Sequence, residues 1–509
     1  LQMFSNFLFN PANYSNVPGI PIAAAPLLPE FQTPAQPPLS RKEADRIWDL
    51  PGVTFETTFK QYAGYLNGVP GDYLHYWFLE SQRSPSTDPL VLWLTGGPGC
   101  SAYIAALSEN GPFHPNRDGA TLYENVFAWN KVSNLIYIDS PRGVGFSFQD
   151  ETINPDTVWD DDRSANDIYL ALKDFLTVYP EYIGRPFYIT GESYGGIYVP
   201  STASLLVDKI TSGELVGLNF QGIAVGNGQL SGLQQVNAAI QMQYFHGAYG
   251  KAEWDALQAC CPQQQHPGDP LYFEFCDYTP FIYLDKSGNV TPKDPNDPCG
   301  VRIANMSQNI PFSGPQDVYN LYESCYEPGQ DGNGRPNLKK PFYADPNFVD
   351  QAWLVSHESS DSQDGFTCWG GDKLEDYLNL PEVQAAMHVR ETENKTVFSS
   401  CSDVVAMTYT WEYNDTSRFF RNIIDKGYPF RVLIYNGDVD SACNFLADQW
   451  FIEALVRSYS MPSTKTRGPW LYLTQIAGYD QQWHYNNFTV DLLTIKGAGH
   501  MSPADRPGP

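Results

Sequence analysis

The sequence contains no run of about eighteen apolar residues, the length that a membrane-spanning helix needs. Its first residues also lack the basic start and the uninterrupted apolar core of a secretory signal peptide. We therefore expect a chain that does not enter a membrane and that has already been processed.

Basic residues are scarce, with 31 Lys and Arg against 58 Asp and Glu and a formal net charge of -27. The cations that would neutralise phosphate groups are missing, so we expect no nucleic acid and no anionic membrane as partner. Acidity of this kind first indicates solubility, and an acidic working environment is the more specific interpretation.

The nine cysteines do not form C-x-x-C pairs with histidines at zinc spacing, so we expect no metal site. Their bunching in the second half indicates a disulfide framework made in an oxidising compartment, with one thiol left over. Six candidate glycosylation sites agree with secretion, at Asn13, Asn289, Asn305, Asn394, Asn414 and Asn487.

Composition divides the chain into four parts. Residues 1–39 are rich in proline and predict an extended arm. Residues 40–229 and 371–509 carry the strand and helix signals of one enzyme core. Residues 230–370 hold six cysteines and little periodicity, which predicts a disulfide-rich cap inserted over the sheet.

Short apolar runs that end at Gly, Asp or Asn predict buried strands of a parallel sheet at Leu90–Leu94, Leu135–Ile138, Phe187–Thr190, Gly222–Val225, Arg431–Tyr435 and Leu492–Ile495. Two alternating segments, Thr54–Leu66 and Tyr73–Glu80, predict an antiparallel pair. Helices are predicted over Arg41–Trp48, Asp160–Tyr179 and Lys373–Val389, the last broken at Pro381. This alternation predicts an α/β fold with a mostly parallel central sheet.

The segment Gly191-Glu192-Ser193-Tyr194-Gly195-Gly196 follows a predicted strand and precedes a predicted helix. A G-x-S-x-G turn in this setting is typical of a nucleophile elbow, which lifts the serine above the edge of the sheet. Ser193 is therefore our candidate nucleophile.

A serine needs a base, an orienting carboxylate and oxyanion donors. Of eight histidines, only His500 directly follows a predicted buried strand near the C-terminus. The strand before it in sequence runs into both Asp438 and Asp440, and the pattern alone does not separate them. One oxyanion donor should be the N–H of Tyr194, and the other should come from the Gly-rich loop at 93–101.

Six segments resemble motifs of the serine carboxypeptidase family, of the carboxypeptidase Y type, and are most similar to its secreted fungal branch. They match in the family's order and cover about residues 50–230 and 370–505, whereas the arm and the cap match poorly. The motifs are W-L-x-G-G-P-G-C-S at 93–101, D-S-P-x-G-x-G-F-S at 139–147, G-E-S-Y-G-G at 191–196, G-I-A-x-G-N-G at 222–228, N-G-D-x-D at 436–440 and G-A-G-H-M at 497–501.

The resemblance implies an α/β-hydrolase fold with a catalytic triad of Ser193, Asp440 and His500. It favours Asp440 over Asp438, because the family uses the second aspartate of N-G-D-x-D. It also implies that the N–H groups of Gly97 and Tyr194 stabilise the oxyanion, and that no metal or other cofactor takes part.

The same resemblance implies a site for the substrate's C-terminal carboxylate, in which two carboxyl side chains share a proton. Its residues would be Trp93, Thr95, Gly96, Glu109 and Glu192. The family usually has Asn at the place of Thr95, and Thr offers one donor fewer and a shorter reach. The shared proton predicts capture of the carboxylate at acid pH.

The resemblance further implies that Cys443 is a free thiol near the substrate pocket and that Met501 lines the pocket of the leaving amino acid. Cys100 would then be bridged to a distant cysteine, for which Cys401 is the candidate. The pairing of the six cysteines in the cap does not follow from the sequence.

These features predict a serine-type carboxypeptidase that acts on the C-termini of peptides or proteins in an oxidising, acidic compartment, secreted or vacuolar and lysosome-like. An acyltransferase or esterase on the same scaffold is the alternative, and a catalytically silent binding protein is a third. The sequence leaves monomer and homodimer both open.

Overall fold

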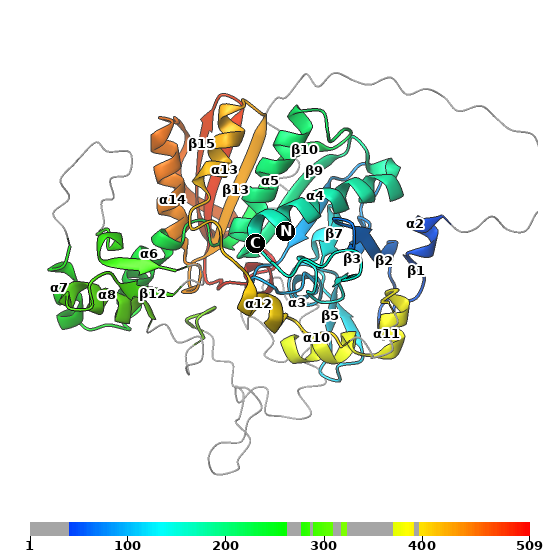
Figure 1. Cartoon of the computed structure of the whole chain (residues 1–509), viewed down its shortest axis with the longest axis horizontal. Helices are drawn as coiled ribbons and strands as arrows, with labels where there is room; N and C mark the ends of the chain where they lie inside the picture. Colours follow the sequence, from blue (N-terminus) through cyan, green and yellow to red (C-terminus); the bar gives the residue numbers. More distant parts are fainter. Residues whose placement is uncertain (1–39, 262–275, 286–288, 309–316, 323–369, 391–396) are drawn as a thin grey trace, which may run out of the picture.

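The computed structural model describes residues 40–261, 276–285, 289–308, 317–322, 370–390 and 397–509 (Figure 1). The arm predicted over residues 1–39 lies outside this range, and so do Cys325, Cys368, Asn13 and Asn394.

A sheet of twelve strands forms the centre of the described structure. Its six middle strands are parallel and lie in the order β7 (Asn134–Ile138), β4 (Leu90–Leu94), β9 (Pro186–Ser193), β10 (Asn219–Gly228), β13 (Phe430–Gly437) and β16 (Phe488–Ile495). Each of the six apolar runs predicted as a buried strand is one of these, which confirms the mostly parallel sheet.

Antiparallel strands extend the sheet at both edges. On one side these are β1 (Arg46–Ile47), β2 (Gln61–Asn67), β3 (Asp72–Leu79) and β8 (Phe148–Gln149), and on the other β15 (Gln475–Tyr485) and β14 (Ser463–Tyr472). Smaller two-stranded sheets pair β5 (Phe113–Pro115) with β6 (Leu122–Glu124) and β11 (Ile282–Leu284) with β12 (Val290–Pro292).

The described helices are α2 (Arg41–Ala44), α3 (Tyr103–Ser108), α4 (Asp161–Val178), α5 (Gly195–Thr211), α6 (Gly232–Phe245), α7 (Lys251–Gln258), α8 (Pro298–Gln308), α10 (Gly370–Leu378), α11 (Pro381–Ala386), α12 (Asp403–Thr408), α13 (Ser417–Asp425), α14 (Phe445–Ser458) and α15 (Ser502–Asp505).

The sheet has a separate hydrophobic core on each face, because successive side chains of a strand point to opposite faces. One core packs the sheet against α4, α5, α13 and α14. The other packs it against α3, α10 and α11. In α4, Ile168, Leu172 and Phe175 form the buried stripe predicted from sequence, and the Asp160 side chain caps the first turn.

The described part of the insertion, α6 to α8, has a small core of its own. Its cysteines form the disulfides Cys260–Cys299 and Cys261–Cys276. Figure 1 shows these helices to one side of the sheet, beyond α14, against which α6 packs. The boundaries of the cap at 230 and 370 stay a prediction.

One prediction of local structure is wrong, and one pair of strands was missed. The helix expected over Arg41–Trp48 ends at Ala44, because the next residues pair as β1 with β2. The hairpin of β14 and β15 was not predicted, because most of β14 is exposed and polar and therefore gives no apolar run. The predicted break at Pro381 is confirmed, since it begins α11 after the end of α10.

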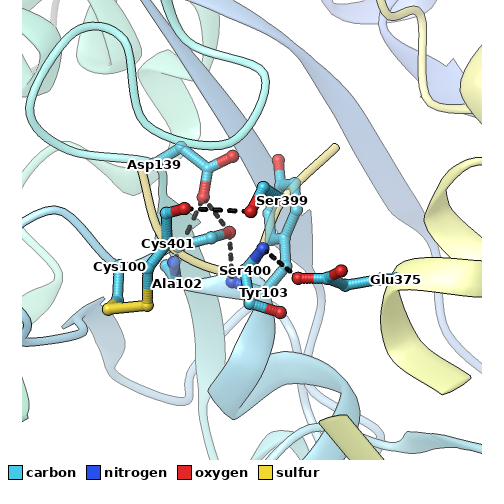
Figure 2. The surroundings of a disulfide bond; sticks show 9 residues. Cys100, Ala102, Tyr103, Asp139, Glu375, Ser399, Ser400 and Cys401 are labelled. Atoms are coloured by element: carbon cyan, nitrogen blue, oxygen red, sulfur yellow. Dashed lines mark hydrogen bonds between the residues drawn. A yellow bond between two sulfur atoms is a disulfide. The ribbon is translucent and has the colours of Figure 1, made fainter. Parts of the chain in front are cut away.

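The Cys100–Cys401 disulfide joins the loop after β4 to the segment before α12, across 301 residues of sequence (Figure 2). Two backbone hydrogen bonds flank it: Ser101 N donates to Ser400 O at 2.8 Å, and Ser402 N donates to Gly99 O at 2.8 Å. The buried carboxylate of Asp139 accepts from the Ser101 hydroxyl and from Ala102 N, and Figure 2 shows Asp139 and Ala102 beside the disulfide. The loop after β4 is therefore held by the disulfide at Cys100 and by the bonds of Ser101 and Ala102 to Asp139.

Replacing both Cys100 and Cys401 with serine should lower the free energy of unfolding by about 2 to 5 kcal/mol, because the unfolded chain regains the freedom that this long cross-link removes. Chemical denaturation followed by tryptophan fluorescence measures the loss. The matched control replaces Cys260 and Cys299, whose separation is only 39 residues, and should lose about 2 kcal/mol less. Equal losses in the two variants would contradict the chain-entropy explanation.

Candidate active site

Ser193 is the last residue of β9 and stands in a sharp turn before α5. Its φ of 62° lies in the left-handed region, which is uncommon for a residue other than glycine and is strained. Gly191 and Gly196 make the turn possible: a Cβ at Gly191 would lie 2.4 Å from Leu94 O, and one at Gly196 would lie 2.3 Å from Gln229 N. The segment has the form of the predicted elbow.

Asp440 and His500 meet because the neighbouring parallel strands β13 and β16 end at the same edge of the sheet. His500 Nδ1 lies 2.7 Å from Asp440 Oδ2, and both side chains are buried. Asp438, the other candidate, points elsewhere, since its carboxylate accepts a hydrogen bond from Gly497 N at 2.7 Å. The geometry therefore places Asp440 and not Asp438 against the imidazole.

Three further donors fix the Asp440 carboxylate. Asn227 Nδ2 lies 2.9 Å from Oδ2, Cys443 N lies 3.1 Å from the same oxygen, and Ala442 N lies 2.8 Å from Oδ1. Burial by itself lowers the pKa of His500, but the adjacent Asp440 carboxylate outweighs it and raises that pKa above 6.5. Asp440 thus orients the ring and stabilises its protonated form.

The Ser193 side chain lies close to the thiol of Cys443, whose backbone N–H binds Asp440. Ser193, Cys443, Asp440 and His500 therefore form one continuous cluster. Cys443 is the free cysteine of the described chain, and burial raises the pKa of its thiol well above 9.0. A protonated thiol is a weak nucleophile, so it does not compete with the serine.

The glycine loop after β4 lies directly against the elbow. A Cβ at Gly96 would stand 2.4 Å from Tyr194 N and 2.6 Å from Ser193 Cβ. Gly97 has a φ of 114°, which only glycine adopts without strain. The loop thus brings its backbone beside the N–H of Tyr194, where the sequence predicts the oxyanion donors.

Glu109 and Glu192 form a hydrogen-bonded pair of buried carboxyls beside Ser193. Glu109 follows the last residue of α3, and Glu192 precedes the elbow serine. Burial raises the pKa of Glu109 to about 7, and burial together with the charge of Glu109 raises the pKa of Glu192 well above 4.5. The pair shares a proton because two adjacent buried carboxyls do not both ionise.

Thr95 directly follows the last residue of β4, and its hydroxyl forms a hydrogen bond with Trp93. The Trp93 indole N–H donates to Thr95 Oγ1 at 2.8 Å, and the Trp93 ring packs edge-on against Trp129. The threonine oxygen is thereby used as an acceptor. Its own hydroxyl hydrogen can still be donated to a ligand.

Two residues that contact the triad were not predicted from the sequence. The Tyr319 ring lies 4.8 Å from the His500 ring, and Tyr319 O accepts from His500 N at 2.7 Å. Tyr319 comes from the insertion, which has no periodicity that predicts such a contact. Asn227 lies in the G-I-A-x-G-N-G motif, so its position was visible in the sequence although its bond to Asp440 was not.

The remaining candidates lie around this cluster or on the surface. Met501, half-buried, directly follows His500. Among the candidate glycosylation sites in the described residues, Asn289, Asn305 and Asn487 are exposed and Asn414 is half-buried. A search of these residues finds no group of His, Cys, Asp or Glu side chains that could hold a metal ion, and no helix able to span a membrane.

Comparison with known proteins agrees with this geometry. The model of the family "Serine carboxypeptidase" matches residues 51–509. A serine carboxypeptidase of Caenorhabditis elegans, ctsa-3.1, is 37% identical over 92% of this chain and 87% of its own length. The lysosomal protective protein of Mus musculus is 36% identical over 92% of this chain and 93% of its own.

The structure also resembles the crystal structure of Kex1(delta)p, a prohormone-processing carboxypeptidase from Saccharomyces cerevisiae. The two superpose with a TM-score of 0.62 over 92% of this chain and 94% of the other, at 18% identity, which shows a shared fold. This confirms the predicted α/β-hydrolase architecture. Membership of the fungal branch stays a prediction. The chain belongs to the serine carboxypeptidase family.

Proposed function

We propose that the chain releases single C-terminal amino acids from peptides through an acyl-enzyme formed on Ser193. The observation that carries this proposal is the buried Glu109–Glu192 pair directly beside the serine. A serine with a base and an orienting carboxylate supports any acyl transfer. A proton-sharing carboxyl pair adds a site for a carboxylate, which is what a carboxypeptidase must recognise.

In the reaction, Ser193 Oγ attacks the carbonyl carbon of the last peptide bond and His500 takes the hydroxyl proton. The N–H groups of Gly97 and Tyr194 stabilise the oxyanion. His500 then gives its proton to the departing amine. The rest of the peptide stays bound to Ser193 as an ester. Water hydrolyses that ester by the same proton transfers in reverse, while Asp440 keeps the imidazole in place.

The substrate's carboxylate is bound by donors near the Glu109–Glu192 pair. The shared proton supplies one hydrogen bond, and Gly96 N–H and the Thr95 hydroxyl supply others. Trp93 holds Thr95 in place through its indole N–H. Because Glu192 precedes Ser193 in the chain, the bound carboxylate is kept close to the nucleophile.

Cys443 and Met501 contribute to the pocket in this proposal. The closeness of the Cys443 thiol to Ser193 supports the first assignment, and the position of Met501 next to His500 supports the second. Both residues lie on loops that also carry triad members.

An esterase or acyltransferase is the second candidate, and Thr95 is the observation that favours it. Threonine binds a carboxylate less completely than the usual asparagine, so an alcohol instead of water could intercept the acyl-enzyme. The assembled Ser193, Asp440 and His500 speak against a catalytically silent binding protein.

We place the enzyme in an oxidising compartment of the secretory pathway, secreted or vacuolar and lysosome-like. Three disulfides among the described residues support this. The name of the mouse relative, lysosomal protective protein, agrees. Glycosylation of the exposed sequons Asn289, Asn305 and Asn487 is part of the same proposal, as is a monomer or homodimer.

A blocked dipeptide should be hydrolysed at least tenfold faster with a free C-terminal carboxylate than with a C-terminal amide, because only the free acid engages the carboxyl pair. Steady-state kinetics at pH 5 to 6 measures the ratio. Equal rates on both substrates would exclude the carboxypeptidase. As a control for the nucleophile, a fluorophosphonate should label the wild type on Ser193 and leave the Ser193→Ala variant unlabelled.

The pH dependence should differ between a free-acid peptide and a simple ester. The pKa of Glu109 is raised to about 7 and that of Glu192 well above 4.5, so the pair keeps a proton at acid and neutral pH and loses it as the pH rises further. His500 must be neutral to act as base, so its raised pKa makes activity fall on the acid side. We expect a bell-shaped kcat/KM for the peptide and only the acid limb for the ester. If kcat/KM fell at alkaline pH for the ester as well as for the peptide, the loss could not be assigned to the carboxyl pair.

Replacing Thr95 with valine should raise KM for free-acid peptides by about three- to tenfold, the effect of losing roughly one hydrogen bond. Thr95→Ser, which keeps the hydroxyl, serves as the matched control and should stay within about twofold of the wild type. Thr95→Asn should lower KM, because the amide adds a donor. An unchanged KM in Thr95→Val would remove this residue from the carboxylate site.

A further inference from the structure

Three residues stand at one level across three neighbouring strands. Glu192 of β9 pairs in register with Gly226 of β10, and Gly226 pairs with Tyr435 of β13. Residues paired in this way point to the same face of a sheet, and adjacent strands lie about 4.8 Å apart. Glu192 and Tyr435 therefore rise from the same face with only a glycine between them.

The phenol of Tyr435 occupies the space above Gly226. A Cβ at Gly226 would lie 2.5 Å from Tyr435 Cε2 and Cζ and 2.6 Å from its hydroxyl oxygen. The ring thus leans across β10 toward β9 and carries its hydroxyl toward Glu192. This contact also gives a physical reason for a glycine at position 226, next to Asn227, which binds Asp440.

The Tyr435 hydroxyl is buried and has no hydrogen-bond partner within the part of the chain that the structure describes. The same holds there for Glu109 Oε2, Glu192 Oε2 and Asn110 Nδ2. Glu109, Asn110 and Tyr435 line one cavity, together with Trp129 and Arg506 among others. Buried polar atoms are nearly always paired, so these atoms need a partner that the cavity can hold.

We propose that Tyr435 is a positioning residue for carboxylate recognition, and that a water in this cavity links its hydroxyl to the Glu109 side chain. The water accepts hydrogen bonds from Asn110 Nδ2 and from the Tyr435 hydroxyl, and donates one to Glu109 Oε2. These three bonds match the number that a buried water usually makes. The inference rests on the proposed function, because it assigns a support to the carboxyl pair used there.

The water between Tyr435 and Glu109 affects where the proton of the Glu109–Glu192 pair is held. A donor to Glu109 favours the ionised form of that carboxyl. When the proton of Glu192 turns from Glu109 toward the substrate's carboxylate, the water keeps Glu109 hydrogen-bonded. Tyr435 acts through this water and does not touch the substrate.

Other titratable groups face the pair from the surrounding elements. Those with acid or basic side chains are His500, Asp440 and Asp505 from the loops and short helix at the sheet edge, and Arg506 at the cavity. Tyr137, Tyr319, Cys443 and His114 face it as neutral groups. A change at Tyr435 leaves the chemistry of all of them unchanged, so a shift in the titration of the pair can be assigned to the lost hydroxyl.

Tyr435→Phe tests the proposal by removing one hydroxyl and keeping the ring. The pH at which KM for a free-acid peptide begins to climb should rise by roughly half a unit to one unit, because the ionised pair loses a donor. The kcat for a simple ester should stay within about twofold. The control is Tyr377→Phe, a buried tyrosine of α10 whose hydroxyl donates to Pro51 O at 2.7 Å, and it should leave the KM profile unchanged.

Two further variants secure the interpretation. Asn110→Leu removes the other donor to the water and should move the KM profile in the same direction, which covers the case that Tyr435→Phe does not fold. In a Glu109→Gln background, Tyr435→Phe should add no further shift, because the carboxyl that the water supports no longer titrates.

The outcomes separate this inference from the proposed function. If the wild type hydrolyses C-terminal amides as fast as free acids, the proposed function fails and the inference fails with it. If the wild type prefers free acids while folded Tyr435→Phe and Asn110→Leu keep the wild-type KM profile, only the inference is overturned. A shift that persists in the Glu109→Gln background would also overturn it, because it would act by another route.

Discussion

The contact between the carboxyls of Glu109 and Glu192 is the interaction on which the function of this site depends. Two carboxyl groups removed from water cannot both carry a charge at this distance without a large cost, so the pair keeps a proton at pH values where exposed acids have lost theirs. Glu192 is also covalently next to Ser193. Under the proposed function, the strained turn that lifts the nucleophile therefore also sets the distance between the bond to be cut and the site for the terminal carboxylate.

The parallel sheet brings the other parts of the site together from distant places in the chain. The loop with Gly97 follows β4, Ser193 ends β9, Asp440 follows β13 and His500 follows β16. Parallel strands place their carboxyl ends at one edge, and cores on both faces of the sheet keep those ends in register. The Cys100–Cys401 disulfide and the antiparallel β-bridge between the same two residues hold the loop after β4 against the segment before α12.

The features predicted from sequence are those with a local signal. Apolar runs identified all six parallel strands, and the small residues around Ser193 identified the elbow. The choice between Asp438 and Asp440 needed the family resemblance, because both follow the same strand and only their hydrogen bonds distinguish them. The contact of Tyr319 with His500 joins segments far apart in sequence, and such a contact leaves no periodic pattern.

The presence of Thr95 in place of the usual asparagine, together with the carboxyl pair, affects how strongly peptides are preferred over esters. An asparagine amide binds a carboxylate at any pH, because it does not titrate, whereas a pair of carboxyls binds only while it keeps its proton. In this chain the shorter Thr95 also accepts a bond from Trp93, which leaves it a single donor for the substrate. Under the proposed function, recognition of the free C-terminus then falls more on the titratable pair. Under that proposal, the preference for peptides over esters should therefore change more with pH in this chain than in a relative that has the asparagine.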